Sequence, residues 1–246
     1  GLNRRDFLRA SALAVGTIVV SSGLQGCLSS SSSDDAAREL SFNHGVASGD
    51  PLADRVIIWT RVTPLDGRSA DISVGWEIAT DAAFTDLVHS GTATTGAARD
   101  YTLKGDAQNL LPGTTYYYRF KAADVISPVG RMKTLPAGSI DQVRFAVMSC
   151  SNYPAGYFHV YAAAAAESEL DAVIHLGDYI YEYGNGGYAT EDAAALGRLL
   201  PDNNAGEILT LTDYRRRYAL YRTDTDLQSL HAAAPFIAVW DDHEVA

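Results

Sequence analysis

The chain has 246 residues, of which 47% are hydrophobic and 20% charged. This composition excludes wholesale disorder, and the length is sufficient for two domains with separate cores. The formal net charge of -11 and the pI near 4.8 disfavour a primary role in nucleic-acid binding, which depends on neutralising phosphates with basic side chains. An acidic chain can still bind phosphate locally through metal ions.

Residues 1–27 have the pattern of a targeting segment. The basic stretch NRRDFLR precedes an apolar run of roughly a dozen residues, which is too short to span a bilayer. Arg4 and Arg5, followed by Phe7 and Leu8, resemble a twin-arginine export signal. The resemblance predicts export by the twin-arginine translocase and a location in the periplasm or at the cell surface.

The targeting segment ends in LQGC, which resembles a lipobox and would make Cys27 the lipidated residue, attached to a membrane. Gln25 departs from the small residue usual at its position, so an ordinary signal peptide cut nearby is the alternative. Residues 28–38 are rich in serine and have nothing to bury, which is typical of a flexible linker. Because Cys27 lies in the signal region, Cys150 has no disulfide partner within the folded part.

Residues 39–137 contain short alternating segments separated by turn signals. Between Ile72 and Ile78, apolar side chains alternate with small or polar ones, the period of a strand with one buried face. Further strands are expected over RVIIWTRV, LVHSGTATT, ARDYTL and TTYYYRFKAAD. The spacing of these segments is typical of a β-sandwich.

The segment LLPGTTYYYRF resembles the fibronectin type III signature, with Leu110, Pro112, Thr114 and Tyr116 at matching positions. The resemblance implies that Tyr116 is the corner tyrosine, whose ring packs while its hydroxyl bonds the backbone a few residues upstream. We therefore expect residues 39–137 to form an all-β sandwich of the fibronectin III or Ig-like type.

Residues 138–246 have a different pattern, in which apolar strands alternate with helices. The first strand is expected to be buried, because its apolar run is continuous. The order strand, helix, strand, helix, strand favours an α/β layer with a largely parallel sheet. The predicted strands are VRFAVM at 143–148, DAVIHL at 171–176 and PFIAVW at 235–240.

Two helices are predicted between these strands. The first runs over residues 153–169, with Pro154 in its first turn and five successive alanines. The second runs over residues 212–222, with either Thr212 or Asp213 as its cap and its tyrosines on one face. We expect a solvated or ion-paired face for the arginines of this region, which are Arg215, Arg216, Arg217 and Arg222.

Each of the three predicted strands of the α/β part is followed by side chains suited to metal binding. The carboxyl ends of parallel strands meet along one edge of a sheet, where ligands bind. Because the three sets share that edge, they could form one site. The residues are Cys150 after the first strand, Asp178 and Tyr181 after the second, and Asp241, Asp242, His243 and Glu244 after the third.

Asp178 and Tyr181 are three positions apart, so they share a face if the chain turns helically after the strand. A carboxylate there could bridge two cations about 3.5 to 4 Å apart. Gly177 would allow a sharp turn and a close approach to a bound ion. Taken singly, each residue also has a structural interpretation: a turn-capping Asp178, a buried Cys150, a packing Tyr181. We expect structural roles for His44 and His175.

GDYIYEY and WDDHE, together with SC, FNHGVASGDP and VIIWTR, resemble the PhoD-type alkaline phosphatase and phosphodiesterase family within the metallophosphoesterase superfamily. The resemblance implies that an α/β metallophosphatase-like domain, truncated here and covering residues 138–246, follows the sandwich. Metallophosphatases need further histidines from later strands, including a His-x-His pair that this chain lacks. We therefore expect the chain to be the front portion of a longer enzyme and to be inactive by itself.

The same resemblance assigns roles to the residues after the strands. Cys150 and Tyr181 would bind a ferric ion, and Asp178 would bridge from it to one or more calcium ions. Asp242 would be a second-site ligand, with Asp241 as a further candidate ligand. His243 would act with Asp242 in catalysis and would stabilise the transition state or the leaving oxygen.

The reaction implied is hydrolysis of a phosphomonoester or phosphodiester by a metal-activated water. Two other functions stay open. One is a lipid-anchored surface binding protein whose phosphatase domain is degenerate. The other is a metallophosphoesterase selective for nucleotides or phospholipids.

Overall fold

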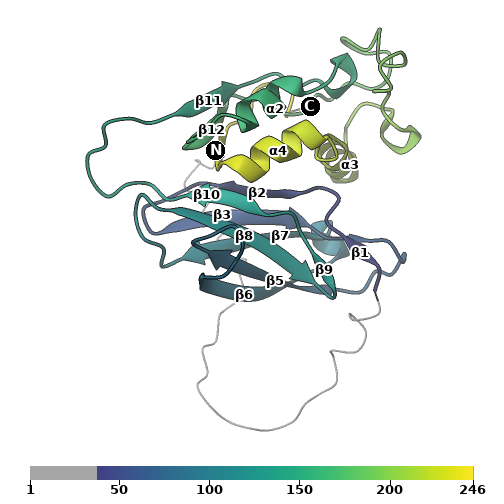
Figure 1. The fold of residues 1–246 in the computed structure, drawn as a ribbon. Coiled ribbons are helices and arrows are strands. Elements are labelled where there is room, and N and C mark those ends of the chain that lie inside the picture. Colours follow the sequence, from purple (N-terminus) through teal and green to yellow (C-terminus); the bar gives the residue numbers. More distant parts are fainter. Residues whose placement is uncertain (1–37, 246) are drawn as a thin grey trace, which may run out of the picture. The chain divides into compact units, whose positions relative to one another are not determined.

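The computed structural model describes residues 38–245, whose regular secondary structure is mostly β-sheet (Figure 1). The targeting segment and all but the last residue of the serine-rich linker lie outside this range, and so does Cys27. Within residues 38–245, no helix combines the length and the apolar character needed to cross a membrane.

One sheet has five strands in the order β10-β8-β5-β6, with β9 paired to β8. All of its pairings are antiparallel, and the inward side chains of its strands contribute to a core of large apolar residues. The strands are β5 (Ile72–Ala79), β6 (Leu87–Thr95), β8 (Thr115–Ala122), β9 (Val125–Ile126) and β10 (Gly130–Lys133).

A second sheet has six strands in the order β11-β12-β13-β2-β3-β7, and a short pair joins β1 (Leu40–Ser41) to β4 (Thr63–Pro64). Strands β11 to β2 are parallel, as the alternation of strands and helices predicts, whereas β2, β3 and β7 are antiparallel. The strands are β2 (Val46–Gly49), β3 (Arg55–Arg61), β7 (Thr102–Gln108), β11 (Phe145–Met148), β12 (Ala172–His175) and β13 (Phe236–Ala238).

The six-stranded sheet runs through both parts of the chain, because β13 pairs with β2 at Phe236 and Gly49. The N–H of Asp50 donates to the carbonyl of Phe236 at 3.4 Å. A Cβ on Gly49 would lie only 2.9 Å from that carbonyl oxygen, so glycine permits the close approach of the two strands.

Two predictions for the sandwich segment are confirmed. In β5, Ile72, Val74 and Ile78 are fully buried and Ser73 is exposed. The buried Tyr116 accepts a hydrogen bond at its hydroxyl from the N–H of Leu111 at 2.9 Å. Tyr116 therefore joins its strand to the turn that precedes it.

Three α-helices, all in the second half of the chain, and three short 3₁₀ segments complete residues 38–245. The α-helices are α2 (His159–Ala165), α3 (Leu211–Tyr221) and α4 (Thr225–Ala233), and the 3₁₀ segments are η1 (Ala97–Arg99), η2 (Tyr153–Ala155) and η3 (Asp202–Asn204).

The predicted helix over residues 153–169 is interrupted. Pro154 lies in η2, Gly156 is fully extended, and α2 begins only after Phe158. The extended backbone at Gly156 prevents the hydrogen-bond ladder of one turn from continuing into the next. Alanine content alone predicted too long a helix.

The cap of α3 is Thr210, so the expectation of Thr212 or Asp213 is wrong. Thr210 is extended, and its hydroxyl accepts from the N–H of Asp213 while the Asp213 carboxylate accepts from the N–H of Thr210. This reciprocal capping box starts the helix at Leu211.

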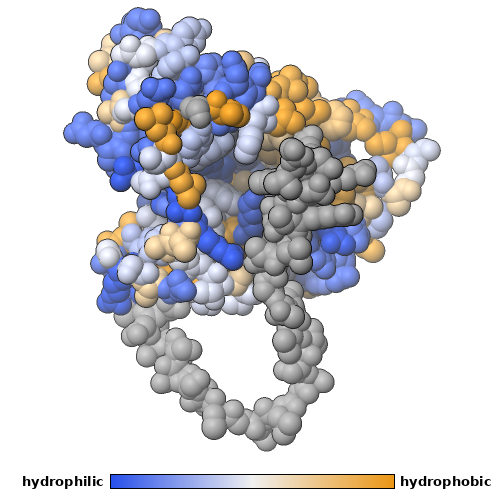
Figure 2. Space-filling view, turned by 180° about the vertical axis from the view of Figure 1, so that it is seen from behind, coloured by the Kyte–Doolittle hydropathy of each residue, from blue (hydrophilic) through white to orange (hydrophobic). Residues whose placement is uncertain are grey.

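The first strand of the α/β part is not buried as predicted. Phe145 is 50% exposed and Val147 58%, whereas Ala146 and Met148 face the second hydrophobic core. β11 lies at the edge of its sheet, and within residues 38–245 no element covers its outer face. Figure 2, seen from behind, shows hydrophobic patches among hydrophilic surface on the face that it presents.

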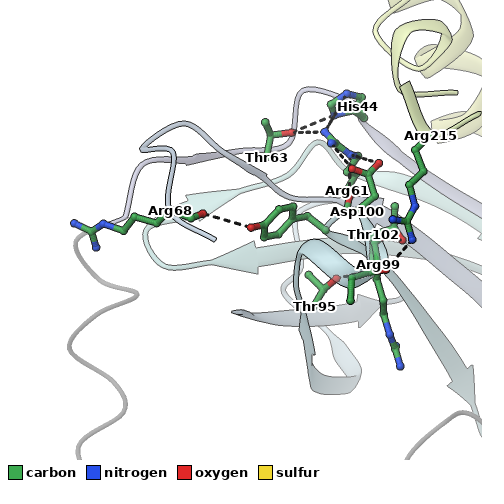
Figure 3. A network of polar contacts seen from close by, with 11 residues as sticks. His44, Arg61, Thr63, Arg68, Thr95, Arg99, Asp100, Thr102 and Arg215 are labelled. Carbon is green, nitrogen blue, oxygen red and sulfur yellow. Dashed lines mark hydrogen bonds and ion pairs between the residues drawn. The ribbon is translucent and has the colours of Figure 1, made fainter. Parts of the chain in front are cut away.

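Arginines of α3 and the residue that follows it bind backbone carbonyls of the sandwich segment. Arg222 is buried and donates to the carbonyls of His44 and Val46, each at 3.0 Å. Arg215 donates to the carbonyl of Ala98 at 2.7 Å (Figure 3). The expectation of a solvated or ion-paired face is therefore wrong for Arg222, because the side chain is buried and its Nη2 binds backbone carbonyls of the sandwich segment.

His44 has a structural environment, as expected. Figure 3 shows it beside Arg61 and Thr63, and Arg61 forms an ion pair with Asp100 at 2.9 Å. Burial, followed by the positive charges of Arg61 and Arg222, lowers the pKa of His44 to about 4. The imidazole is therefore neutral at physiological pH.

We predict that Tyr116→Phe destabilises the protein by about 1 kcal/mol, because the N–H of Leu111 loses its acceptor. Urea denaturation measures the loss. Tyr117→Phe, on the opposite face of the same strand, is the control and should change stability by less than about 0.5 kcal/mol. Equal effects of the two substitutions would contradict the corner role of Tyr116.

Candidate metal centre

The three segments that follow β11, β12 and β13 lie side by side and are joined by backbone hydrogen bonds. After β11, the N–H of Cys150 donates to the carbonyl of Gly177 at 3.2 Å, and the N–H of Ser151 donates to that of Asp178 at 2.8 Å. After β13, the N–H of Val239 donates to the carbonyl of His175 at 3.1 Å. The parallel strand order thus brings the three motifs to one edge of the sheet.

Asp178 lies at the centre of this edge and is 6% exposed. Its Oδ2 accepts from the Sγ of Cys150 at 3.5 Å and from the hydroxyl of Tyr181 at 3.3 Å. Its Oδ1 accepts from the N–H of His243 at 3.4 Å. One carboxylate therefore receives donors from all three motifs that the sequence singled out.

The backbone at Gly177 and Asp178 is left-handed, with φ of +106° and +53°. The chain therefore does not turn helically after β12, although Tyr181 still contacts Asp178. A Cβ on Gly177 would lie 2.5 Å from the backbone N and the Cβ of Asp241. The glycine thus allows the segment after β13 to approach, which is a different reason from the bound ion that the sequence suggested.

Asp178, Asp242 and His243 could hold a metal ion, since one ligand atom from each lies within 4.8 Å of the others. Carboxylate oxygens with an imidazole suit several hard or borderline cations. Within residues 38–245, this group does not include Cys150 or Asp241. Cys150 is exposed and contacts the group through Asp178, whereas the N–H of Asp241 donates to Glu244.

His243 contacts the rings of Tyr181 and Tyr183 and the carboxylate of Glu182. Its Nδ1–H donates to Oε2 of Glu182 at 2.7 Å, and its ring stacks on Tyr181 with the centroids 4.1 Å apart. Burial lowers the pKa of His243, but the hydrogen bond to Glu182 and the charges of Glu182, Asp178 and Asp242 outweigh it and raise the pKa. Glu182 is a site residue that the sequence reasoning missed, although it belongs to the GDYIYEY motif.

Tyr181 is held as a neutral phenol. Burial, followed by the negative charge of Asp178, raises its pKa far above the ordinary value. Loss of the phenolic proton beside Asp178 would require a compensating positive charge, such as a cation bound between the two groups.

Three buried residues support the site from behind. His175 is fully buried, as expected, and its Nε2 lies 3.1 Å from the hydroxyl of Tyr161. Arg217 is 1% exposed and donates to the carbonyls of Tyr181 and Tyr183. Its expected solvated or ion-paired face is therefore wrong, because the segment after β12 leaves carbonyls that need a donor.

Glu244 is the third of these residues. The sequence placed it among the side chains suited to metal binding but assigned it no role, and in the structure it binds backbone amides. It is 6% exposed and accepts hydrogen bonds from three backbone N–H groups. Its place in the run WDDHE indicated a solvated charge as readily as a buried one, and no periodicity marked it as buried.

The family model described as PhoD-like phosphatase matches residues 145–246, and the model of the N-terminal domain of PhoD-like phosphatases matches residues 27–136. A curated relative, alkaline phosphatase D of Bacillus subtilis (strain 168), is 44% identical over 211 residues. That alignment covers 83% of this chain and 35% of the relative.

A solved structure described as the structure of PhoD superposes with a TM-score of 0.76 at 43% identity, over 83% of this chain and 39% of that one. The sixth fibronectin type III domain of human fibronectin type III domain containing protein 3 covers 40% of this chain at a TM-score of 0.30, which is too low to establish a shared fold. The chain thus spans little more than a third of the proteins that it matches well.

We predict that Gly177→Ala lowers the free energy of unfolding by about 3 kcal/mol or more, because it combines an unfavourable φ with a clash against Asp241. Gly186→Ala is a matched control: its φ is +85° but its Cβ would meet nothing within 4 Å. The control should cost about 1 kcal/mol in urea denaturation. Equal costs would mean that the approach of Asp241 is unimportant.

A second prediction concerns the proton on His243. In metal-free protein, its pKa should lie above the ordinary value of 6.5, and Glu182→Gln should lower it, because the hydrogen bond and charge of Glu182 stabilise the imidazolium. NMR titration of the imidazole protons measures both values. The interaction of Glu182 with the protonated His243 stabilises the fold fully at pH below 6.5. This stabilisation is lost as the pH rises through the folded-state pKa of His243. A titration unchanged by the substitution would contradict the pairing.

Proposed function

The chain belongs to the PhoD-like phosphatase family, and on that premise we propose that it forms part of an exported, metal-dependent phosphoester hydrolase. One observation carries the proposal: Cys150, Tyr181 and His243, from three separate strand ends, all donate to the carboxylate of Asp178. The substrate class is a phosphomonoester or a phosphodiester.

We propose a fibronectin III or Ig-like sandwich over residues 39–137 and the first part of a metallophosphatase-like α/β domain over residues 138–246. Two separate hydrophobic cores support this division, one within residues 40–132 and one within residues 158–236. The remaining ligands, which include histidines, are proposed to come from further segments of a longer protein, since the chain spans 35% of the curated relative.

The residues fit the metals that the family resemblance implies. Asp178 would bridge a ferric ion, held also by Cys150 and Tyr181, and calcium, held also by Asp242 with Asp241 as a further candidate. The carboxylates of Asp178 and Asp242, which lie close together, supply the oxygen ligands that calcium takes. The thiol and the phenol on Oδ2 of Asp178 support the iron side. When bound, these cations would polarise the phosphoryl oxygens and lower the pKa of a water that attacks phosphorus.

His243 then has a defined task. Its Nδ1–H is committed to Glu182, and its raised pKa favours the imidazolium, so Nε2–H is available to donate to a phosphoryl or leaving oxygen. Stacking on Tyr181 fixes the plane of the ring. Ser151 is buried against Tyr161 and His175, which does not suit a side-chain nucleophile.

Export through the twin-arginine translocase, and membrane attachment through a lipidated Cys27, are part of the proposal. They depend on residues 1–27, outside the described residues. Export in the folded state would suit a protein that acquires its metals before crossing the membrane. It would leave the enzyme in the periplasm or on the cell surface.

The test uses the longer parent protein, purified without chelators. We expect bound iron and calcium by elemental analysis and hydrolysis of p-nitrophenyl phosphate or its bis ester. Asp178→Asn should lower kcat/KM by about two orders of magnitude or more and reduce the bound metal, because the bridging carboxylate is lost. Asp141→Asn, an exposed residue before β11, is the control.

A wild-type protein that binds no metal after reconstitution would overturn the proposal. In that case the better hypothesis is a lipid-anchored surface binding protein with a degenerate phosphatase domain. Bound metal with hydrolysis of only nucleotide or phospholipid esters would narrow the substrate instead.

A further inference from the structure

The carboxylate of Glu244 is buried against the segment that holds Asp178. Oε2 accepts from the N–H of Asp178 at 3.0 Å and from the N–H of Asp241 at 2.9 Å. Oε1 accepts from the N–H of Tyr179. A single side chain thus satisfies two successive amides after β12 and one amide after β13.

Backbone amides compensate the charge of this buried carboxylate. Among residues 38–245, Glu244 forms no ion pair with an arginine or a lysine. A buried carboxylate without hydrogen-bond donors would be costly, and so would buried N–H groups without an acceptor. The carboxylate and its three N–H donors therefore stabilise one another. The carboxylate and the two segments are therefore ordered together.

Two of the three amides that Glu244 binds, those of Asp178 and Tyr179, belong to the left-handed turn and to the residue after it. Successive N–H groups after such a turn form a concave site for an anion, called a nest. Here the nest of Asp178 and Tyr179 holds the chain's own carboxylate. These two amides are thereby unavailable to a phosphate ligand.

The same contact fixes the distance between the segments after β12 and β13. Gly177 packs against Asp241, and the N–H of Asp241 is held by Glu244. The hydroxyl of Tyr214 donates to the carbonyl of Glu244 at 3.1 Å, which anchors the residue to α3. Rotation of Glu244 out of the nest would remove an acceptor from both segments at once.

We propose that Glu244 is a positioning residue, which holds the left-handed turn so that Asp178 points at Cys150, Tyr181 and His243. Glu244 does not touch the substrate or the ions. Its effect on metal binding rests on the proposed function, whereas its effect on the three amides does not.

The test compares Glu244→Gln with wild type in the full chain. The carboxamide keeps the shape but has one acceptor oxygen, so either Tyr179 or the pair Asp178 and Asp241 faces an NH₂ group instead. Hydrogen exchange at these amides should accelerate about tenfold or more, while exchange in β5 and β8 stays unchanged. Calcium affinity, measured by calorimetry with Ca²⁺ as the probe, should fall about 10- to 100-fold.

Glu207→Gln is the matched control, since Glu207 is exposed and lies close enough to act on Tyr183 by its charge. It removes one negative charge near the site without removing an amide acceptor, so both readouts should stay within about twofold of wild type. Glu244→Asp keeps the charge but shortens the reach, and faster exchange there would show that geometry is decisive.

Unchanged exchange at the three amides in Glu244→Gln would overturn the inference. If that variant does not fold, wild-type exchange decides: rapid, unprotected exchange at Asp178, Tyr179 and Asp241 overturns the inference, and slow exchange supports it. A wild type that binds no Ca²⁺ while its amides are protected would count against the proposed function and leave the positioning role intact.

Discussion

The candidate metal centre depends on the left-handed turn at Gly177 and Asp178, where the chain leaves β12. A left-handed residue other than glycine costs on the order of 1 to 3 kcal/mol, and the surroundings must supply that energy. The neighbouring segments do so by binding the turn on both sides, through the carbonyls of Gly177 and Asp178 and through the carboxylate of Glu244. The turn points the Asp178 side chain at the other motifs, so the geometry of the whole site depends on the turn.

The site collects negative charge and offsets it locally. Asp178, Asp242, Glu182 and Glu244 lie around the ends of two strands, and like charges this close repel one another. Glu244 is offset by backbone amides and Glu182 by His243. A cation between the carboxylates of Asp178 and Asp242 would offset the remainder. This is why the arrangement suits a metal centre better than a solvated charge run.

The two hydrophobic cores share one sheet, which connects the sandwich segment with the candidate metal centre. β2 of the first part pairs with β13 of the second, and the segment after β13 carries Asp242 and His243. Arg222 binds carbonyls next to β2 from the end of α3. The position of the segment after β13 therefore depends on the sandwich segment, although the site side chains identified among residues 38–245 all come from residues after the sandwich.

The sequence by itself determined the features that short-range order encodes. Period-two alternation located β5, a fibronectin-like segment located the hydroxyl of Tyr116, and strand order brought Cys150, Asp178, Tyr181 and His243 to one edge. Only the tertiary structure decided which polar residues are buried, as with Arg217 and Glu244, and which apolar ones are exposed, as with Phe145 and Val147 on β11. The physical reason is that burial depends on what packs against a residue from distant parts of the chain. Local periodicity indicates which side chains share a face of a strand or helix, but not what packs against that face.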